Sequence, residues 1–466
     1  MTNALDVHLY DRIIGQILLK NNKPILQYSP AYVDDPQAVP LSVQFPVRSR
    51  EYANDDVESY LENLLPDSAA VREQWARDAG LLRANTFDLL TVYGGDVAGG
   101  IELYPEGKGR SDNSSLTPVN DSWIADRIRT IRADPTAWNN STDRVGQFSL
   151  AGAQGKFALA LHDEGWYEPS GAHPSTHIFK PGIANLDGSD ISEHVLMQTA
   201  QRLGLEAATT QLLEFDQEHV LVVERFDRYL LDGKVKRVHQ EDFAQATATP
   251  VLHKYEQDGG PGVAALAQTI ARHCSDDQIE ADLTALTNAL VFFWIIGHGD
   301  AHAKNYSLLL LPGLTKLAPF YDINCNFLLQ TTQVIRAQDY NGFNGTELAM
   351  KVNGVNTVGA YTHETLAELS KTFGLHKSYA SEVANFFAQH IQSALNQVIS
   401  ELPKNIQKLR SHRKSASGDL LPNTTSQRRV SEINSCHVSE GFCVGFLVTQ
   451  AIAPQKTTAL IYRAIK

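Results

Sequence analysis

One short stretch of the sequence combines the residue types that phosphoryl transfer requires. It reads His298-Gly299-Asp300-Ala301-His302-Ala303-Lys304-Asn305 and lies between two apolar segments. The spacing of His298, Asp300 and Asn305 is H-x-D-x-x-x-x-N, which is typical of the catalytic loop of protein kinases. In such loops the aspartate accepts the proton of the acceptor hydroxyl, and the asparagine holds magnesium. The stretch therefore predicts a magnesium-dependent kinase with Asp300 in the place of the base.

Three further residues follow the order of a kinase active site. Asp322 comes two positions after the strand-like residues 316–320, where kinases carry the metal-binding aspartate of D-F-G. Upstream, Lys180 ends an apolar strand and Glu193 lies near the start of the next helix, the order of the lysine and glutamate that pair in kinases. Taken alone, each is also explained as a solvent-facing lysine or as a glutamate that favours a helix N-terminus. Amide and carboxylate oxygens from Asn305 and Asp322 would suit magnesium.

Residues 149–156 could form a loop over phosphates. They read Ser-Leu-Ala-Gly-Ala-Gln-Gly-Lys between two strand-like segments, so small side chains would let backbone N–H groups approach phosphate oxygens. The segment matches neither the Walker pattern nor G-x-G-x-x-G, and by itself it is better explained as a glycine turn.

Two other interpretations of the 298–305 stretch remain open at this point. His298, Asp300 and His302 could be zinc ligands of a metallohydrolase. Lys304 and Asn305 are not residues that usually surround zinc, and no further histidine cluster in the sequence completes such a site. A polar loop that only caps a buried helix is the other alternative.

The elements that must position these residues form two parts of different character. Residues 1–140 mix short strands with one clear helix, which Asp67 or Ser68 can cap and which runs to Gly80. A polar stretch at 134–144 marks a boundary. Strands are then expected at 159–161, 177–180 and 219–226, with a helix over 191–203 that Gly204 closes. After Asp258 the chain is predicted to be mainly helical, including an apolar helix over 279–296.

Composition excludes several classes of protein. The 466 residues carry a formal net charge of -13, so the surface should on average repel a polyphosphate backbone, which disfavours direct nucleic-acid binding. The N-terminus has no cationic start followed by an apolar region, and the longest uninterrupted apolar run, Ala289 to Ile296, is shorter than the ~20 residues of a membrane span. The four scattered cysteines indicate free thiols. We expect a soluble, cytoplasmic enzyme without a membrane partner.

Six ordered segments resemble the HipA family of bacterial toxin kinases, over the chain from near its N-terminus to about residue 410. They are LLPDS at 64–68, SLAGAQGK at 149–156, VERFDR at 223–228, YEQDGGPG at 255–262, GDAHAKN at 299–305 and PFYDI at 319–323. The resemblance implies an α+β fold: a small N-terminal β-rich domain over 1–140, then a kinase-like two-lobed core over 141–410 with a mainly helical C-terminal lobe.

The resemblance also implies roles for individual residues. Asp300 would be the catalytic base, Asn305 and Asp322 would bind Mg2+, and Lys180 would hold the phosphates of ATP. Ser149 would be the autophosphorylation site, where a charge of about −1.5 to −2 would expel the loop and silence the enzyme. The remaining positions assigned to the nucleotide are Ala151, Gly152, Ala153, Gln154, Gly155 and Lys156 over the phosphates, Glu224, Arg225 and Phe226 at the adenine, and His302, Ala303, Lys304 and Tyr321, to which no more specific role is given.

The family implies partners as well. These are a small, basic, helix-turn-helix antitoxin dimer similar to HipB, operator DNA bound through that complex, and a substrate in the translation machinery such as glutamyl-tRNA synthetase.

Two departures from the family and two rival functions remain. Gly155 stands where relatives often have a bulkier residue, which we expect to loosen the loop, and residues 411–466 form an atypical, disordered or weakly attached tail. The spacing of Asp300, His302 and Asn305 also resembles phosphatidylinositol kinases, so a lipid or small-molecule acceptor is one rival. An inactive kinase fold that acts only as corepressor with its antitoxin is the other.

Overall fold

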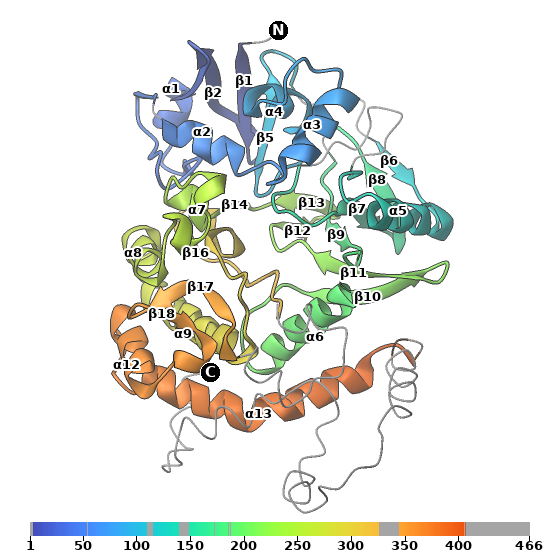
Figure 1. The fold of residues 1–466 in the computed structure, drawn as a ribbon. Helices are drawn as coiled ribbons and strands as arrows, with labels where there is room; N and C mark the ends of the chain where they lie inside the picture. The colour runs from blue at the N-terminus through green and yellow to red at the C-terminus, as the bar shows by residue number, and fades with distance from the viewer. Residues whose placement is uncertain are drawn as a thin grey trace, which may run out of the picture.

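The computed structural model describes residues 3–406, apart from 54, 110–114, 139–148, 172, 185, 187, 326–343 and 405. The expected tail at 411–466 lies outside this part of the chain. Figure 1 shows three tiers, with the N-terminal sheet at one end, a second sheet in the middle and a helical region at the other end. The predicted α+β class with an N-terminal β-rich domain and a kinase-like two-lobed core is confirmed.

The N-terminal domain is built on an antiparallel five-stranded sheet of order β4-β3-β2-β1-β5. Tight turns at Tyr10-Asp11 and Asn21-Asn22 join its first strands; both residues of each turn have positive φ, which matches the right-handed twist of a hairpin. The strands are β1 (Ala4–Leu9), β2 (Arg12–Lys20), β3 (Lys23–Tyr28), β4 (Glu51–Tyr52) and β5 (Ile101–Pro105). The helices of this domain are α1 (Pro30–Val33), α2 (Asp55–Glu62), α3 (Ala69–Asp78) and α4 (Thr86–Tyr93).

The start of α3 shows which of the two candidate residues, Asp67 or Ser68, caps this helix. Ser68 is the residue that caps this helix, because its side chain accepts a hydrogen bond from the Val71 N–H. Asp67, one residue earlier, is therefore left for other contacts.

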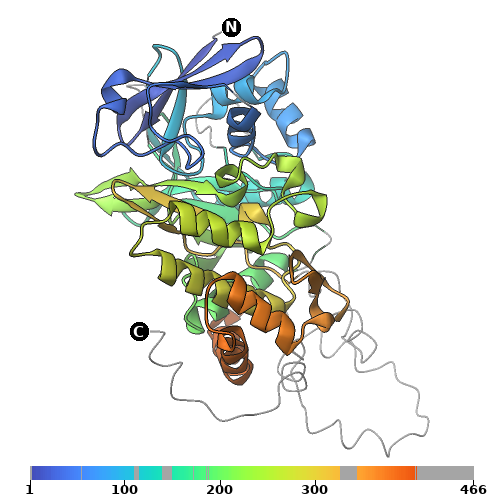
Figure 2. The ribbon, with the colours of Figure 1, turned by 90° about the vertical axis from the view of Figure 1, so that its left-hand side faces the viewer.

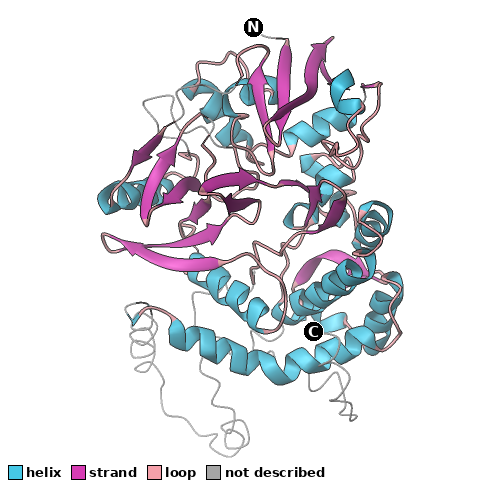
Figure 3. Ribbon diagram, turned by 180° about the vertical axis from the view of Figure 1, so that it is seen from behind, coloured by secondary structure: helices cyan, strands magenta, loops and turns pink. Residues whose placement is uncertain are grey.

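A six-stranded sheet forms the small lobe of the core, in the order β10-β11-β9-β7-β8-β6. Its strands are β6 (Leu116–Pro118), β7 (Phe157–His162), β8 (Gly165–Pro169), β9 (His177–Lys180), β10 (Thr210–Phe215) and β11 (Glu218–Glu224). Helix α5 (Asp121–Ala133) packs on β10 and β11, and α6 (Ser189–Arg202) packs on the same two strands. Figure 3 shows this sheet from behind, with both helices against it. Residues 116–133 thus pack with the second sheet, although they precede the boundary expected near residue 140.

The large lobe is mainly helical. It contains α7 (Phe243–Ala246), α8 (Val263–His273), α9 (Ile279–Ile296), α12 (His363–Thr372) and α13 (Tyr379–Glu401), with short helices η1 (Val251–His253), η2 (Glu256–Asp258), η3 (Ala303–Asn305) and η4 (Val358–Ala360). Short strand groups join it to the rest: β12 (Arg228–Leu231) with β13 (Lys234–Arg237), β14 (His239–Asp242) with β15 (Ser307–Leu311) and β16 (Leu314–Leu317), and β17 (Glu347–Val352) with β18 (Val355–Thr357).

Helix α9 lies within this lobe, against α8 and α13. By length and composition alone it is apolar enough to cross a membrane, and it is the one helix in the described residues that passes this test. The core helix of a large protein passes the same test, and the burial of the α9 side chains from Val291 to Ile296 accounts for its composition.

Buried ion pairs join the N-terminal domain to the turn between β11 and β12, which links the two lobes. Arg228 lies 2.9 Å from Asp96, and Arg225 lies 2.9 Å from Asp227 and 3.6 Å from Asp96. All four side chains are buried, so removing one partner would leave a charge without its counter-charge. These ion pairs therefore hold the N-terminal domain and the core together. Figure 2 shows the N-terminal sheet lying above the strands of the core.

Candidate active site

Lys180 connects the small lobe to the segment that carries Asp322. It is the last residue of β9, and its ammonium lies 2.6 Å from Glu193 Oε1 and 2.8 Å from Asp322 Oδ1. Glu193 faces it from one turn inside α6. Burial by itself lowers the pKa of Lys180, but the charges of Asp322 and Glu193 outweigh it and raise the pKa. For Asp322, burial acts upward and the attraction of Lys180 outweighs it, so its pKa is lowered.

Asp322 has a backbone conformation that is uncommon for residues other than glycine. Its φ is 58°, in the left-handed region, and such residues often mark functional sites. The preceding Tyr321 donates its hydroxyl to the Lys304 carbonyl at 2.7 Å, and its ring packs 5.6 Å from that of Phe226. The segment before Asp322 therefore contacts the catalytic loop on one side and the turn between β11 and β12 on the other.

The 298–305 stretch folds as a compact loop ending in η3. The Asn305 amide nitrogen donates to the Asp300 carbonyl at 2.7 Å, so its oxygen is left to face a ligand. Burial raises the pKa of the Asp300 carboxyl, and the charge of Asp322 adds to this effect, so the two carboxylates act on one common region. Burial lowers the pKa of His302 to about 3, which makes it neutral near pH 7. Although His302 Nε2 lies 3.9 Å from Asp300, it is therefore no ion-pair partner for that carboxylate.

Tyr255 contacts the predicted base directly and was not foreseen from the sequence. Its hydroxyl donates a hydrogen bond to Asp300 Oδ1, and its ring meets the His302 ring edge-on at 4.8 Å. In the sequence, the YEQDGGPG segment carries only the family resemblance, and nothing in its spacing to Asp300 indicates this contact.

Lys304 points toward the N-terminal domain. Its ammonium is 2.7 Å from Asn63 Oδ1, 3.4 Å from Asp242 and 3.7 Å from Asp67, and its side chain is buried. These partners account for the charge of Lys304.

The 149–156 loop closes on itself and on the small lobe. Lys156 is buried and donates to the Ala151 carbonyl at 2.6 Å, while the Gln154 amide donates to the Pro181 carbonyl at 3.1 Å, next to Lys180. Burial and, to a smaller extent, the neighbouring charge of Lys180 lower the pKa of Lys156 to about 8, although the charge of Asp322 acts in the opposite direction. Lys156 and Lys180 thus form a pair of close, like charges, an arrangement that a polyanion would stabilise.

Gly155 does not loosen this loop, contrary to our expectation. A Cβ at this position would lie 2.6 Å from Ile131 Cγ2 and 3.3 Å from the Pro135 carbonyl oxygen. Glycine is therefore needed here for close packing of the loop against α5, and a larger side chain would push the two apart.

The side chain of Arg225 is hydrogen-bonded to other protein groups, so it is not available to a nucleotide. It donates to Asp227, Ser175 and the Val97 carbonyl, all buried. The backbone N–H groups of Glu224 and Arg225 are bonded to the Thr209 and Thr176 carbonyls. Of the predicted adenine-contact residues, Phe226 is thus the one whose side chain turns toward the active-site segments, through Tyr321.

A metal cluster of the zinc type is not found among the described residues: no three His, Cys, Asp or Glu side chains gather there as a ligand group. Of the proposed zinc ligands, His298 is buried beside the Phe293 ring at 4.9 Å. Magnesium needs fewer protein ligands, because it keeps several waters and binds substrate phosphates. The Asn305 amide oxygen and the Asp322 carboxylate fit that demand, since Lys180 and the Asn324 amide both reach Asp322 through Oδ1.

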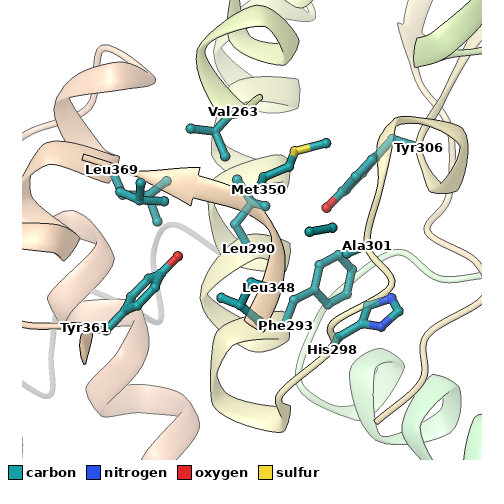
Figure 4. A pocket seen from close by; sticks show the side chains of 12 residues that line it. Val263, Leu290, Phe293, His298, Ala301, Tyr306, Leu348, Met350, Tyr361 and Leu369 are labelled. Carbon is teal, nitrogen blue, oxygen red and sulfur yellow. The ribbon is translucent and has the colours of Figure 1, made fainter. Parts of the chain in front are cut away.

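A small cavity of about 20 Å3 lies behind the catalytic loop, between α9 and β17. Figure 4 shows the Tyr306 hydroxyl directed into it beside Met350 and Ala301. This hydroxyl has no hydrogen-bond partner among the described residues, and the volume suffices for about one water. The cavity is far too small for a nucleotide. The charged and polar groups that could receive one are Lys156, Lys180, Asn305 and Asp322.

Comparison with known proteins places this site in a family. The HipA-like C-terminal domain matches residues 148–398, and the HipA N-terminal domain matches residues 5–104. The protein Y4mE of Sinorhizobium fredii, named as a candidate kinase, is 35% identical over 327 residues, covering 69% of this chain and 76% of Y4mE. The serine/threonine-protein kinase toxin HipA of Shewanella oneidensis is 29% identical over 420 residues, covering 86% of this chain and 90% of that protein.

A solved structure agrees with these matches. It contains Shewanella oneidensis HipA with HipB and operator DNA, and it superposes with a TM-score of 0.72 at 23% identity over 96% of both chains, so the fold is shared. With both family domains matched in order and a kinase arrangement of Lys180, Glu193 and Asp322, the chain belongs to the HipA family of kinases.

Proposed function

We propose that this chain transfers the γ-phosphate of ATP to a serine or threonine hydroxyl of a protein. The observation that carries the proposal is the buried Lys180, which lies between a helix carboxylate and the Asp322 carboxylate at the junction of the two lobes. Protein kinases need this lysine–glutamate pair and a metal-binding aspartate together. The name of the Shewanella relative supports the same activity and the choice of serine or threonine.

Each residue of the candidate active site has a separate role in the proposed reaction. Lys180 and Lys156 offset phosphate charge, and Asp300 orients the acceptor hydroxyl and accepts its proton as that oxygen bonds to the γ-phosphorus and ADP leaves. Asn305 and Asp322 would hold Mg2+, which supplies charge neutralisation at the phosphate oxygens. Burial raises the pKa of Asp300, which makes it a better proton acceptor than an ordinary aspartate.

Self-phosphorylation at Ser149 belongs to the same proposal. Ser149 begins the loop that lies beside Lys156 and Lys180, so a phosphate on it would compete with the nucleotide for the same cations. The loop would then leave the site and the enzyme would be silenced. Since the loop cannot easily cover its own site and also be the acceptor, transfer is expected between two molecules.

The partners proposed are a basic, HipB-like antitoxin dimer, operator DNA bound through it, and a cytoplasmic substrate in the translation machinery. The solved relative was obtained with HipB and operator DNA, and a net charge of -13 favours a basic partner over bare DNA. Operator DNA should shift strongly in a gel at physiological salt only when the antitoxin is present. An equal shift by the isolated chain would contradict this assignment.

The test of the function is labelling of a cell extract. The purified chain is incubated with γ-labelled ATP, magnesium and extract, and the labelled residues are mapped by mass spectrometry, with Asp300→Asn as the matched control. Label on Ser or Thr of a protein that disappears with Asp300→Asn is the expected result. Label in lipid or a small molecule would favour the lipid-kinase alternative, and absence of label from a chain that still binds antitoxin would favour the corepressor.

A further inference from the structure

The N-terminal domain, which lies outside the two kinase lobes, forms hydrogen bonds with the 149–156 loop. The Ser149 hydroxyl donates to the Leu64 carbonyl at 2.8 Å, and the Ser149 N–H donates to the Asp96 carbonyl at 3.0 Å. Two residues of the LLPDS segment then pair with the loop: Pro66 and Gly152 form a parallel bridge, and the Asp67 N–H donates to the Gly152 carbonyl at 3.1 Å.

Asp67 also connects the 149–156 loop to the large lobe. Its carboxylate accepts the Gly152 N–H at 3.3 Å through Oδ1, receives Lys254 at 2.7 Å through Oδ2 and lies 3.7 Å from Lys304. The side chain is only 9% exposed. Burial acts to raise the pKa of Asp67, but Lys304 and Lys254 outweigh it and lower the pKa to about 2, so the group is ionised at any physiological pH.

This carboxylate is not needed by its own helix. Ser68 caps α3, so the neighbouring Asp67 is available to join the N-terminal domain, the loop and the catalytic loop at one point. A buried charged group that contacts three separate parts of the chain is well placed to set how firmly they are held together.

We propose that Asp67 is a positioning residue that latches the 149–156 loop onto the large lobe, so that the N-terminal domain governs both nucleotide affinity and access to Ser149. The inference rests on the proposed function, which gives the loop its task. It adds that the loop is held shut by an ion pair from a different domain.

The latch has a direct consequence for Ser149. This residue is completely buried, with its hydroxyl bound to Leu64, and a second molecule cannot reach it while the loop is closed. Breaking the Asp67 ion pairs should increase the time that the loop spends open, which weakens nucleotide binding and exposes Ser149 in the same variant.

The first test does not depend on catalysis. Hydrogen–deuterium exchange of the nucleotide-free protein is measured over residues 149–156 for wild type, Asp67→Asn and Asp67→Ala. Asparagine keeps an oxygen for the Gly152 N–H but loses the charge, so exchange should rise by about tenfold for asparagine, equivalent to about 1.4 kcal/mol, and by more for alanine.

Asp242→Asn is the matched control. Asp242 also pairs with Lys304, at 3.4 Å, but it caps α7 and does not touch the loop, and asparagine preserves that cap. Exchange over 149–156 should stay at the wild-type rate in this variant. Unchanged exchange in both Asp67 variants, or an equal rise in Asp242→Asn, would overturn the latch.

The second test uses the reaction. Asp67→Asn should raise the KM for ATP about tenfold with little change in kcat, because the loop is weakened and the reacting groups are intact. Wild-type enzyme should also label Ser149 faster in an Asp300→Asn/Asp67→Asn acceptor than in an Asp300→Asn acceptor, neither of which can label itself. A lower kcat at constant KM, or equal labelling of the two acceptors, would contradict the proposal. If wild type transfers no phosphate at all, the proposed function fails, and the exchange measurement alone decides the latch.

Discussion

Replacement of Lys180 by methionine tests the central ion-pair arrangement. Methionine keeps the length and apolar stem but leaves Glu193, 3% exposed, and Asp322, 35% exposed, without their cation. Breaking a buried pair costs about 3–5 kcal/mol. Because Asp322 can be partly rehydrated, we expect the lower end, about 3 kcal/mol, which corresponds to a fall in Tm of roughly 6–12 °C for folding units of this size.

The loss of stability in the Lys180→Met variant should depend on pH in a defined direction. In the wild type Lys180 lowers the pKa of Asp322, so the stabilisation is present above the unfolded pKa and is lost only as the pH falls through the lower folded value. Burial already raises the pKa of Glu193 to about 7, and without Lys180 both carboxyls should titrate well above their unfolded values. The variant's penalty is then present at high pH and relieved as the pH falls.

Thermal unfolding at about pH 5.5 and about pH 8 measures this difference. The gap in Tm between wild type and Lys180→Met should be larger at the higher pH, and phosphoryl transfer should fall by about 10²–10³. Lys20→Met is the control, since the Lys20–Glu51 pair is roughly half exposed on both sides and is worth about 0–1 kcal/mol. A loss of Tm that is equal for the two variants, or independent of pH, would refute the reasoning.

Five further variants, at four positions, probe individual roles. Asp300→Asn should keep the Tm and ATP binding but abolish transfer, and retained transfer would exclude Asp300 as the base. Asp322→Ala should lose the magnesium-dependent part of ATP affinity in calorimetry; equal affinity with and without magnesium, at the wild-type level, would remove the metal assignment. Ser149→Asp should weaken ATP binding while Ser149→Ala abolishes self-labelling, and a Ser149-phosphorylated sample that binds ATP as tightly as the unmodified protein would disprove the switch. Tyr255→Phe removes a hydrogen bond that lowers the pKa of Asp300, so the acid limb of the pH–rate profile should move to higher pH, and an unmoved limb would show that Tyr255 does not act on the base.

Features carried by neighbouring residues were accessible from the sequence. Helix α9 runs over Ile279–Ile296 as its apolar pattern indicated, and α6 ends where Gly204 adopts φ 88°. The arrangement of Asp300 and Asn305 is also local, because both residues lie in one loop and a hydrogen bond joins the Asn305 amide to the Asp300 carbonyl. Such features depend on side chains a few positions apart, and short-range sterics and hydrogen bonding decide them.

Contacts between distant residues were decided by the tertiary structure. Either Asp67 or Ser68 could cap α3 in the sequence; packing of the domains gave the cap to Ser68 and brought Asp67 to Lys254, 187 positions away. The same holds for Tyr255 on Asp300 and for the close packing of Gly155 against Ile131. These contacts leave no periodic or spacing signal along the chain, because they exist only once separate elements have packed together and buried their charges in one shared, poorly hydrated space.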